Sequence, residues 1–228
     1  MSLTIIIIIV AVFGLSFVYT FYMMKKQKET ANQYKGDDAL AQAPQLQKDL
    51  LPKYFAELEK QMQGAPIDAF TECAYITTVG NKVAAAAVTA VKTAAWAAIG
   101  VKARYNEADN VAYLVLSGED LHYLFFEEGE AKEHLVFDKN RLLNARVGFI
   151  SNAEKVTRMS AIMSQNPSKI NIYIDGNNTD ILYYDFVRRM PGSTLAFQKN
   201  ALDTQAQFAL LGRYFKKRFT EKYPHLNA

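Results

Sequence analysis

The chain has 228 residues, of which 50% are hydrophobic, with a formal net charge of +3 and a single cysteine, Cys73. One cysteine excludes an internal disulfide, and this suits a reducing compartment. The small positive charge, without a concentrated basic face, argues against a nucleic-acid-binding protein.

Residues 3–24 form an uncharged run that includes five consecutive isoleucines. At about 1.5 Å per residue, such a helix reaches roughly 33 Å, enough to cross a hydrocarbon core of about 30 Å. The sequence therefore predicts a single-pass transmembrane anchor over residues 1–24, with the lipid bilayer as a partner. The side chains expected to contact lipid include Leu3, Ile5, Ile9, Phe13, Phe17 and Phe21.

A cleaved signal peptide is the alternative interpretation of this run. We favour an uncleaved anchor, because residues 1–4 contain no basic side chain and the run ends in bulky residues at 21–24 instead of a small-residue cleavage site. Lys25, Lys26 and Lys28 follow the run directly. The positive-inside rule then predicts an N-terminus outside the membrane and a cytoplasmic C-terminal domain.

The polar residues 25–43 predict a juxtamembrane linker. Helical spacing of apolar residues between Leu51 and Met62 predicts a helix that begins at Pro44 or Pro52. The alanine-rich residues 82–101 predict another helix, so that residues 44–101 form a helical region. We favour burial of this second helix in the domain, since Lys92 would cost about 2.5–3.5 kcal/mol at a bilayer centre. An interfacial helix and a second span are the alternatives.

From residue 111 the pattern becomes that of short strands. Runs at 111–116 and 121–126 flank a turn at 117–120 and predict a hairpin. Further strands are predicted at residues 133–137, 142–150, 156–163, 170–174 and 181–187. Seven short strands in residues 102–228 indicate an antiparallel barrel or sandwich, and hence an α+β protein.

A closing amphipathic helix is predicted over residues 201–222, where Phe208, Leu211, Phe215 and Phe219 share one narrow arc. Its later turns contain five basic residues, namely Arg213, Lys216, Lys217, Arg218 and Lys222. This charge suits the negative end of the helix dipole. Contact with an anionic membrane surface or with a partner is the functional alternative.

The hairpin at 113–125, the late strand at 181–186 and the closing helix give residues 111–222 an element order that resembles bacterial pleckstrin-homology-like (PH-like) domains. The resemblance implies a seven-stranded antiparallel barrel or sandwich closed by a C-terminal helix. It also implies an adaptor that binds lipid headgroups, peptides or proteins. Members that bind phosphoinositides have lysines and arginines in the first hairpin loop. Here that loop reads Ser117, Gly118, Glu119 and Asp120, so the headgroup site does not carry over.

No nucleotide-binding, nucleophile or metal motif is present in the sequence. His122, His134 and His225 lie far apart in the chain, without a second ligand at zinc-site spacing. We therefore expect no catalytic residue, cofactor or metal, and the favoured hypothesis is a membrane-anchored, cytoplasmic, non-catalytic interaction domain with a protein partner. The alternative is a membrane-bound enzyme with a site assembled from Tyr183, Asp185, His122 and Arg188.

Overall fold

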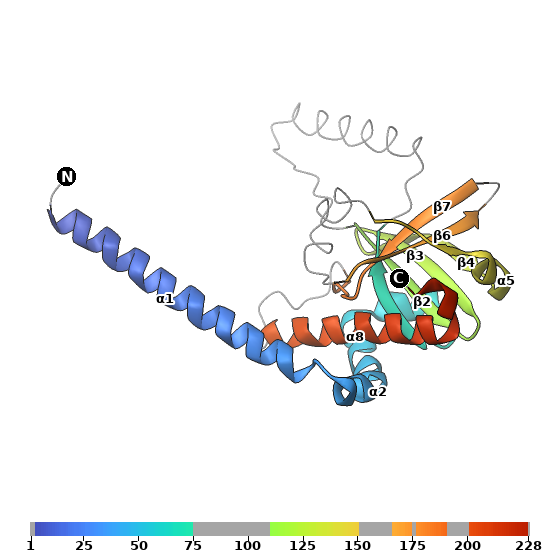
Figure 1. The fold of residues 1–228 in the computed structure, drawn as a ribbon, viewed down its shortest axis with the longest axis horizontal. Helices are drawn as coiled ribbons and strands as arrows, with labels where there is room; N and C mark the ends of the chain where they lie inside the picture. The colour runs from blue at the N-terminus through green and yellow to red at the C-terminus, as the bar shows by residue number, and fades with distance from the viewer. Residues whose placement is uncertain (1–2, 75–109, 151–165, 175–176, 191–200, 228) are drawn as a thin grey trace, which may run out of the picture.

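Seven antiparallel strands form one sheet, with helices packed against it (Figure 1). The computed structural model describes residues 3–74, 110–150, 166–174, 177–190 and 201–227. The strands are β1 Ala69–Cys73, β2 Asn110–Ser117, β3 Asp120–Glu127, β4 Glu130–Phe137, β5 Arg146–Val147, β6 Ser168–Ile174 and β7 Asn177–Tyr183. The helices are α1 Leu3–Gln33, α2 Asp37–Tyr54, α3 Ala56–Gln61, α5 Lys139–Asn144, α8 Ala201–Lys222 and the 3-10 turn η2 Pro224–Leu226. The predicted α+β class is confirmed.

The strand order is β4-β3-β2-β1-β7-β6-β5, so β4 and β5 lie at opposite ends of the sheet. The seven-stranded antiparallel arrangement is as predicted. The predicted closure into a barrel is not observed, because the described strands form an open sheet. The short β1 lies at the centre of the sheet and pairs with both β2 and β7. No strand was predicted for these five residues.

The predicted hairpin is confirmed as β2 and β3, where Ser117 pairs with Asp120 across the turn. Gly118 adopts a φ of +56° there, which a glycine accepts without strain. Strand β6 is confirmed, with Ile170 and Ile172 buried and Tyr173 exposed. The strand predicted at 133–137 is also confirmed, although β4 begins three residues earlier.

The strand predicted at 142–150 is wrong over most of its length. Residues 139–144 form α5, because the Asp138 side chain caps it by accepting a hydrogen bond from the Arg141 N–H at 2.8 Å. The strand predicted at 181–187 ends earlier, at Tyr183. The strand predicted at 156–163 and the alanine-rich helix predicted at 82–101 lie outside the described residues.

The N-terminal region is more helical than predicted. Helix α1 continues to Gln33 and helix α2 begins at Asp37, so most of the predicted linker at residues 25–43 is helical. An exposed Lys25–Glu29 pair at 3.9 Å has helical i,i+4 spacing. Helix α2 begins at Asp37 and not at either proline. Two aspartates in its first turn favour that start, because carboxylates stabilise the positive end of a helix.

The core has two clusters of buried side chains, one on each face of the central strands. The first includes Phe55 and Leu58 from α2–α3, Phe70 and Tyr113 from β1 and β2, and Phe208 and Leu211 from α8. The second includes Ala69, Leu114, Tyr183, the later α8 residues Phe215 and Phe219, and Tyr223, which follows α8 directly. Helix α8 therefore contributes to both clusters, and its predicted apolar arc and its predicted bounds are confirmed.

Helix α8 approaches the backbone closely at Gly212. A Cβ at this position would lie 2.2 Å from the amide nitrogen of Phe186 and 2.3 Å from the carbonyl carbon of Asp185. Only glycine fits this contact, because real Cβ atoms do not approach other atoms so closely. The segment after β7 therefore packs against the helix instead of continuing as strand.

Candidate functional site

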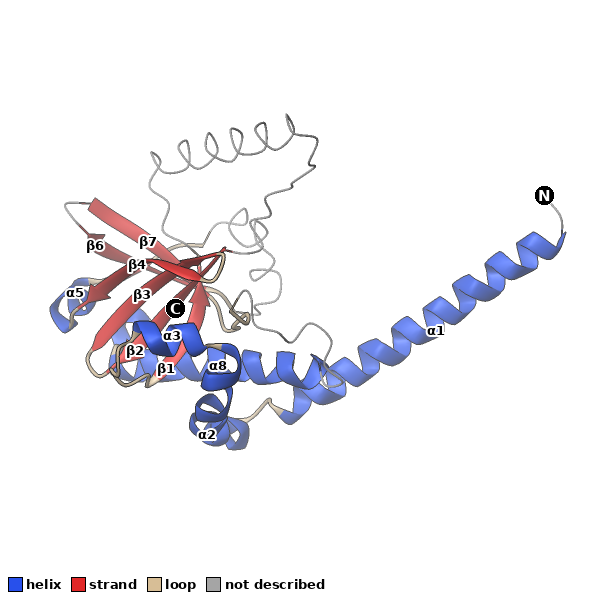
Figure 2. Cartoon of the chain, turned by 180° about the vertical axis from the view of Figure 1, so that it is seen from behind, coloured by secondary structure: helices blue, strands red, loops and turns tan. Residues whose placement is uncertain are grey.

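Helix α1 extends away from the sheet, as Figure 2 shows from behind. Seven large hydrophobic side chains between residues 13 and 22 are each 61–71% exposed, namely Phe13, Leu15, Phe17, Val18, Tyr19, Phe21 and Tyr22. Lys25, Lys26 and Lys28 are also exposed. The side chains of Leu3, Ile5 and Ile9, predicted to contact lipid, lie outside the described residues.

Of the helices in the described ranges, none has the length and hydropathy that crossing a bilayer requires. The membrane span over residues 1–24 stays a prediction.

The end of α1 is attached to α8 by Tyr34, which follows the helix directly. Its hydroxyl donates to Asp203 Oδ1 at 2.7 Å and accepts from Gln207 Nε2 at 3.2 Å. Arg213 Nη2 donates to the Tyr34 carbonyl oxygen. Burial and the Asp203 carboxylate raise the pKa of Tyr34 above its ordinary value. This junction, Tyr34 with Asp203, Gln207 and Arg213, fixes where α1 leaves the domain.

The basic residues predicted for membrane or partner contact lie along α8 but are engaged differently. Arg213 is half-buried at the junction with α1, and burial lowers its pKa. Burial likewise lowers the pKa of Lys216, against the opposing effect of Asp185. Lys222 donates to the Gly118 carbonyl and lies 3.5 Å from Glu119. These three side chains contribute to the packing of α8, which supports the structural interpretation for them.

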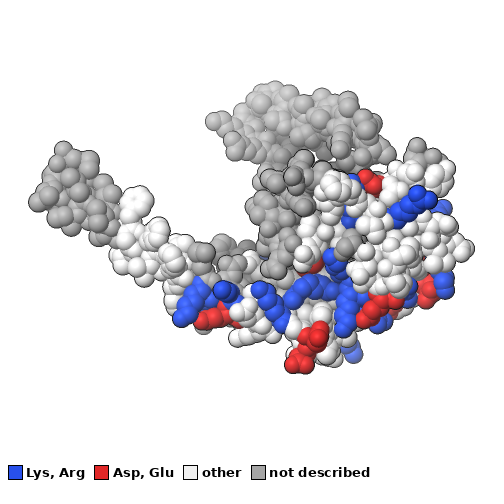
Figure 3. All heavy atoms as spheres, viewed as in Figure 1, with Lys and Arg blue, Asp and Glu red and all other residues white. Residues whose placement is uncertain are grey.

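The other two basic residues of this set are exposed. Arg218 pairs with Glu221 one turn away at 3.4 Å, and Lys217 lies on the exposed side of α8. Figure 3 shows Lys and Arg along this side of the molecule with Asp and Glu among them. The charge is thus a mixed band and not a single-sign patch.

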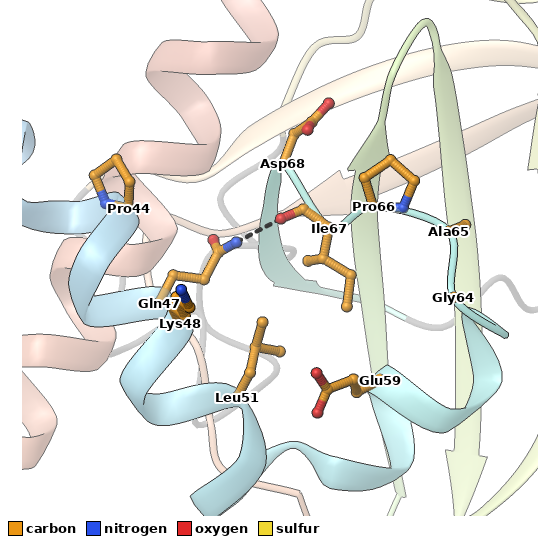
Figure 4. A pocket seen from close by; sticks show the side chains of 10 residues that line it. All are labelled: Pro44, Gln47, Lys48, Leu51, Glu59, Gly64, Ala65, Pro66, Ile67 and Asp68. Carbon is orange, nitrogen blue, oxygen red and sulfur yellow. Dashed lines mark hydrogen bonds between the residues drawn. The ribbon is translucent and has the colours of Figure 1, made fainter.

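A groove of about 510 Å³ lies between α2 and the segment leading into β1 (Figure 4). Its apolar lining comes from Pro44, Leu51, Ala65, Pro66 and Ile67. Gln47 is only 5% exposed and donates from Nε2 to the Ile67 carbonyl at 2.7 Å. Its Oε1 has no hydrogen-bond partner within the described part of the chain. A buried acceptor without a donor is costly, and this atom lies beside the groove with almost no exposed surface.

Lys48, Glu59 and Asp68 complete the lining of this groove. With a mostly apolar lining and a few polar groups, the groove fits recognition of a polar backbone between apolar side chains. Neither the groove nor Gln47 was predicted, because the apolar pattern of residues 51–62 indicates a packed helix and carries no signal for the loop opposite it.

The four residues of the enzyme alternative are not assembled into one site. His122 lies on β3 and Tyr183 on β7, with β2 and β1 between them, which separates the two strands by roughly 14 Å at the usual strand spacing. Tyr183 is buried in the core, and burial raises its pKa to about 12. Asp185 Oδ2 accepts from the Asn166 N–H at 3.2 Å.

Arg188, the fourth residue, pairs with the buried Glu72. Its Nε lies 2.8 Å from Glu72 Oε1, its backbone N–H donates to Oε2 at 3.1 Å, and its carbonyl accepts from the Tyr113 hydroxyl at 2.8 Å. Glu72 is only 1% exposed. The network ties β1 and β2 to the segment after β7, and burial raises the pKa of Tyr113 well above its ordinary value. Its polar groups are directed at one another, which is typical of a structural ion pair.

The structure brings together two histidines that the sequence left apart. His122 Nδ1 lies 2.9 Å from His134 Nε2, and the ring centroids are 5.2 Å apart. Pairing of β3 with β4 is responsible, and only a correct strand register could have revealed it. His225 lies elsewhere, with Nε2 3.1 Å from the Leu142 carbonyl oxygen. No group of three or more metal-binding side chains occurs within the described ranges.

Comparison of the chain with protein-family models, with curated proteins and with solved structures finds no match. The resemblance to PH-like domains therefore rests on the order of elements alone, and function has to be argued from the site.

Proposed function

We propose that this protein is a membrane-anchored, non-catalytic interaction domain, held at the cytoplasmic face by α1. One observation carries the proposal: the large apolar side chains at residues 13–22 are exposed, whereas the described part of the domain buries two hydrophobic clusters of its own. Burying Phe13, Leu15, Phe17, Val18 and Phe21 would contribute roughly 7–15 kcal/mol. In sequence, residues 3–24 contain no charged side chain, and 22 residues in a helix measure roughly 33 Å.

The lysines after this run support the proposed orientation. Lys25, Lys26 and Lys28 are exposed on α1, whereas residues 1–4 contain no basic side chain. Cytoplasmic loops are enriched in lysine and arginine near a span, so the sheet domain is assigned to the cytoplasm.

The groove beside α2 supports an interaction role. It combines an apolar lining with one buried acceptor, the Gln47 Oε1 atom, and peptides present N–H donors between side chains. The contact proposed for a protein partner is therefore this groove. The PH-like element order, in which adaptors are common, is in keeping with that role.

Orientation is tested with single cysteines and a membrane-impermeant maleimide on intact cells. Cys73 is buried and gives little background. We expect Ser2→Cys to react in intact cells, and Lys217→Cys on exposed α8 only after permeabilisation. The reverse pattern, or no labelling of Ser2→Cys before lysis, would contradict the proposed topology.

The interaction role is tested by proximity labelling from the full chain in its membrane. Lys48→Glu changes the charge at the groove, and Lys217→Glu is the matched control on α8. We expect one reproducible set of neighbours that is retained by Lys217→Glu and depleted at least fivefold by Lys48→Glu. A set lost only in Lys217→Glu would assign the contact to α8 instead. Recovery of no neighbour above an anchor-only control would refute the interaction role.

A further inference from the structure

The geometry points to a two-histidine site for a divalent transition-metal ion, formed by His122 on β3 and His134 on the neighbouring edge strand β4. It goes beyond the proposed function and does not depend on it.

Strand register places the two rings on one face of the sheet. His122 lies opposite Val136, and His134 lies opposite Leu124, so the histidines are diagonal neighbours. Directly opposed residues share a face, as do residues two apart on one strand. Each ring is therefore held by a paired strand, which limits how far the two can separate.

The separation of the two facing nitrogens matches a chelate. His122 Nδ1 and His134 Nε2 are 2.9 Å apart. Two nitrogens at 2.0–2.1 Å from a metal lie about 2.9 Å apart at a 90° angle and about 3.3 Å apart at a tetrahedral angle. The first suits tetragonal Cu²⁺ and the second Zn²⁺, so Zn²⁺ needs a shift of only a few tenths of an ångström.

The chemical state of the rings also suits metal binding. Burial lowers the pKa of both histidines, and for His122 the neighbouring ring lowers it further while Asp120 opposes. These shifts favour the neutral imidazole, the form that binds metals. One N–H now bridges the two rings. When this proton moves to the other nitrogen of its own ring, both facing nitrogens have a lone pair.

Access from solvent is open. His134 is exposed, His122 is partly exposed and the neighbouring Val136 is 45% exposed. Water would fill the remaining coordination positions, because the described residues provide no third His, Cys, Asp or Glu ligand to the pair. Two imidazoles favour Cu²⁺ over Zn²⁺ and Ni²⁺ by the general order of divalent affinities.

The test is titration of the untagged full chain in detergent micelles with Cu²⁺ and with Zn²⁺, against a competing chelator. We expect one equivalent of each ion to bind, Cu²⁺ more tightly. His122→Gln and His134→Gln should each weaken binding at least about tenfold. His225→Gln is the matched control and should bind as the wild type does. Binding that is absent, or that survives both substitutions, would overturn the site.

A second measurement on the wild type does not depend on the folding of variants. Imidazole ¹⁵N resonances of His122 and His134 should shift together with one equivalent of Zn²⁺, while those of His225 stay unchanged. Shifts at His225 alone, or at none of the three, would show that the pair is only a hydrogen-bonded contact between strands.

Discussion

Helices α1 and α8 meet at Tyr34 but have opposite relations to the rest of the protein. Helix α8 places Phe208, Leu211, Phe215 and Phe219 in the core, and its exposed side includes the charged residues Lys217, Arg218 and Glu221. The apolar part of α1 is exposed all around between residues 13 and 22. The two helices differ because their apolar residues are distributed differently around the helix axis. The apolar arc of α8 packs against one surface, whereas a helix that is apolar on every side, like this part of α1, needs an apolar environment on every side.

The largest expected contrast compares one phenylalanine from each helix. Phe215 is fully buried, 5.8 Å from the Tyr183 ring, so Phe215→Ala should lower the free energy of unfolding by about 3–5 kcal/mol. Phe17→Ala on α1 should change it by less than about 0.5 kcal/mol. Denaturant unfolding in detergent, followed by near-ultraviolet circular dichroism, measures both. Equal losses would show that α1 is part of the domain core.

A pair of glycines sharpens the comparison. Gly212→Ala places a Cβ against the backbone of Phe186, so we expect a loss of about 2 kcal/mol or more, even though alanine favours the helix. A Cβ on Gly14 of α1 would have no such neighbour within 4 Å. Gly14→Ala should therefore leave the unfolding of the domain unchanged. Thermal unfolding of the two variants reports this directly. A harmless Gly212→Ala would mean that α8 does not approach segment 185–186 as closely as described.

A smaller effect is expected at the junction between the helices. Tyr34→Phe removes the hydroxyl that donates to Asp203 and accepts from Gln207, and should cost about 1 kcal/mol. It should also broaden the distance distribution between spin labels at Lys28→Cys and Lys217→Cys. Tyr22→Phe, on the exposed part of α1, is the control. An unchanged distribution would assign the orientation of α1 to the Arg213 contact alone.

The smallest effect concerns pH. Because the pKa values of His122 and His134 are lowered in the folded protein, protonation favours the unfolded chain. The contribution of the two histidines to the free energy of unfolding is therefore fully present above their unfolded-state pKa of about 6.5. It is lost as the pH falls through their lower folded-state pKa values. We expect a modest fall in Tm below about pH 6, diminished in the His122→Gln, His134→Gln double variant. The same fall in both proteins would exclude the pair as its origin.

Much of the fold follows from local pattern. The turn with Gly118 and the arc of α8 are encoded within a few residues, and both were predicted with accurate bounds. Strand β1 was missed because both its faces are buried, which removes the alternation that marks a strand. Helix α5 was predicted as strand because its cap, Asp138, looks like an ordinary turn residue.

The candidate sites were less predictable, since they depend on contacts between distant segments. The His122–His134 pair needs the register of β3 with β4, and the groove needs a loop placed against Gln47. Arg213, Lys216 and Lys222 look like a surface patch in sequence, but the packing of α8 engages them. The anchor expected over residues 1–24 stays a prediction, since no contact within the described residues tests it.

Membrane extraction of the full chain tests the anchor most directly. We compare the wild type with a Phe13→Lys, Phe17→Lys variant, in which two charges on α1 should cost roughly 5–7 kcal/mol in a bilayer. Phe149→Lys, at an exposed apolar residue of the domain, is the matched control. We expect the wild type and the control to stay in the pellet after alkaline washing, and the double variant to enter the aqueous fraction. Release of the wild type, or retention of all three alike, would contradict it.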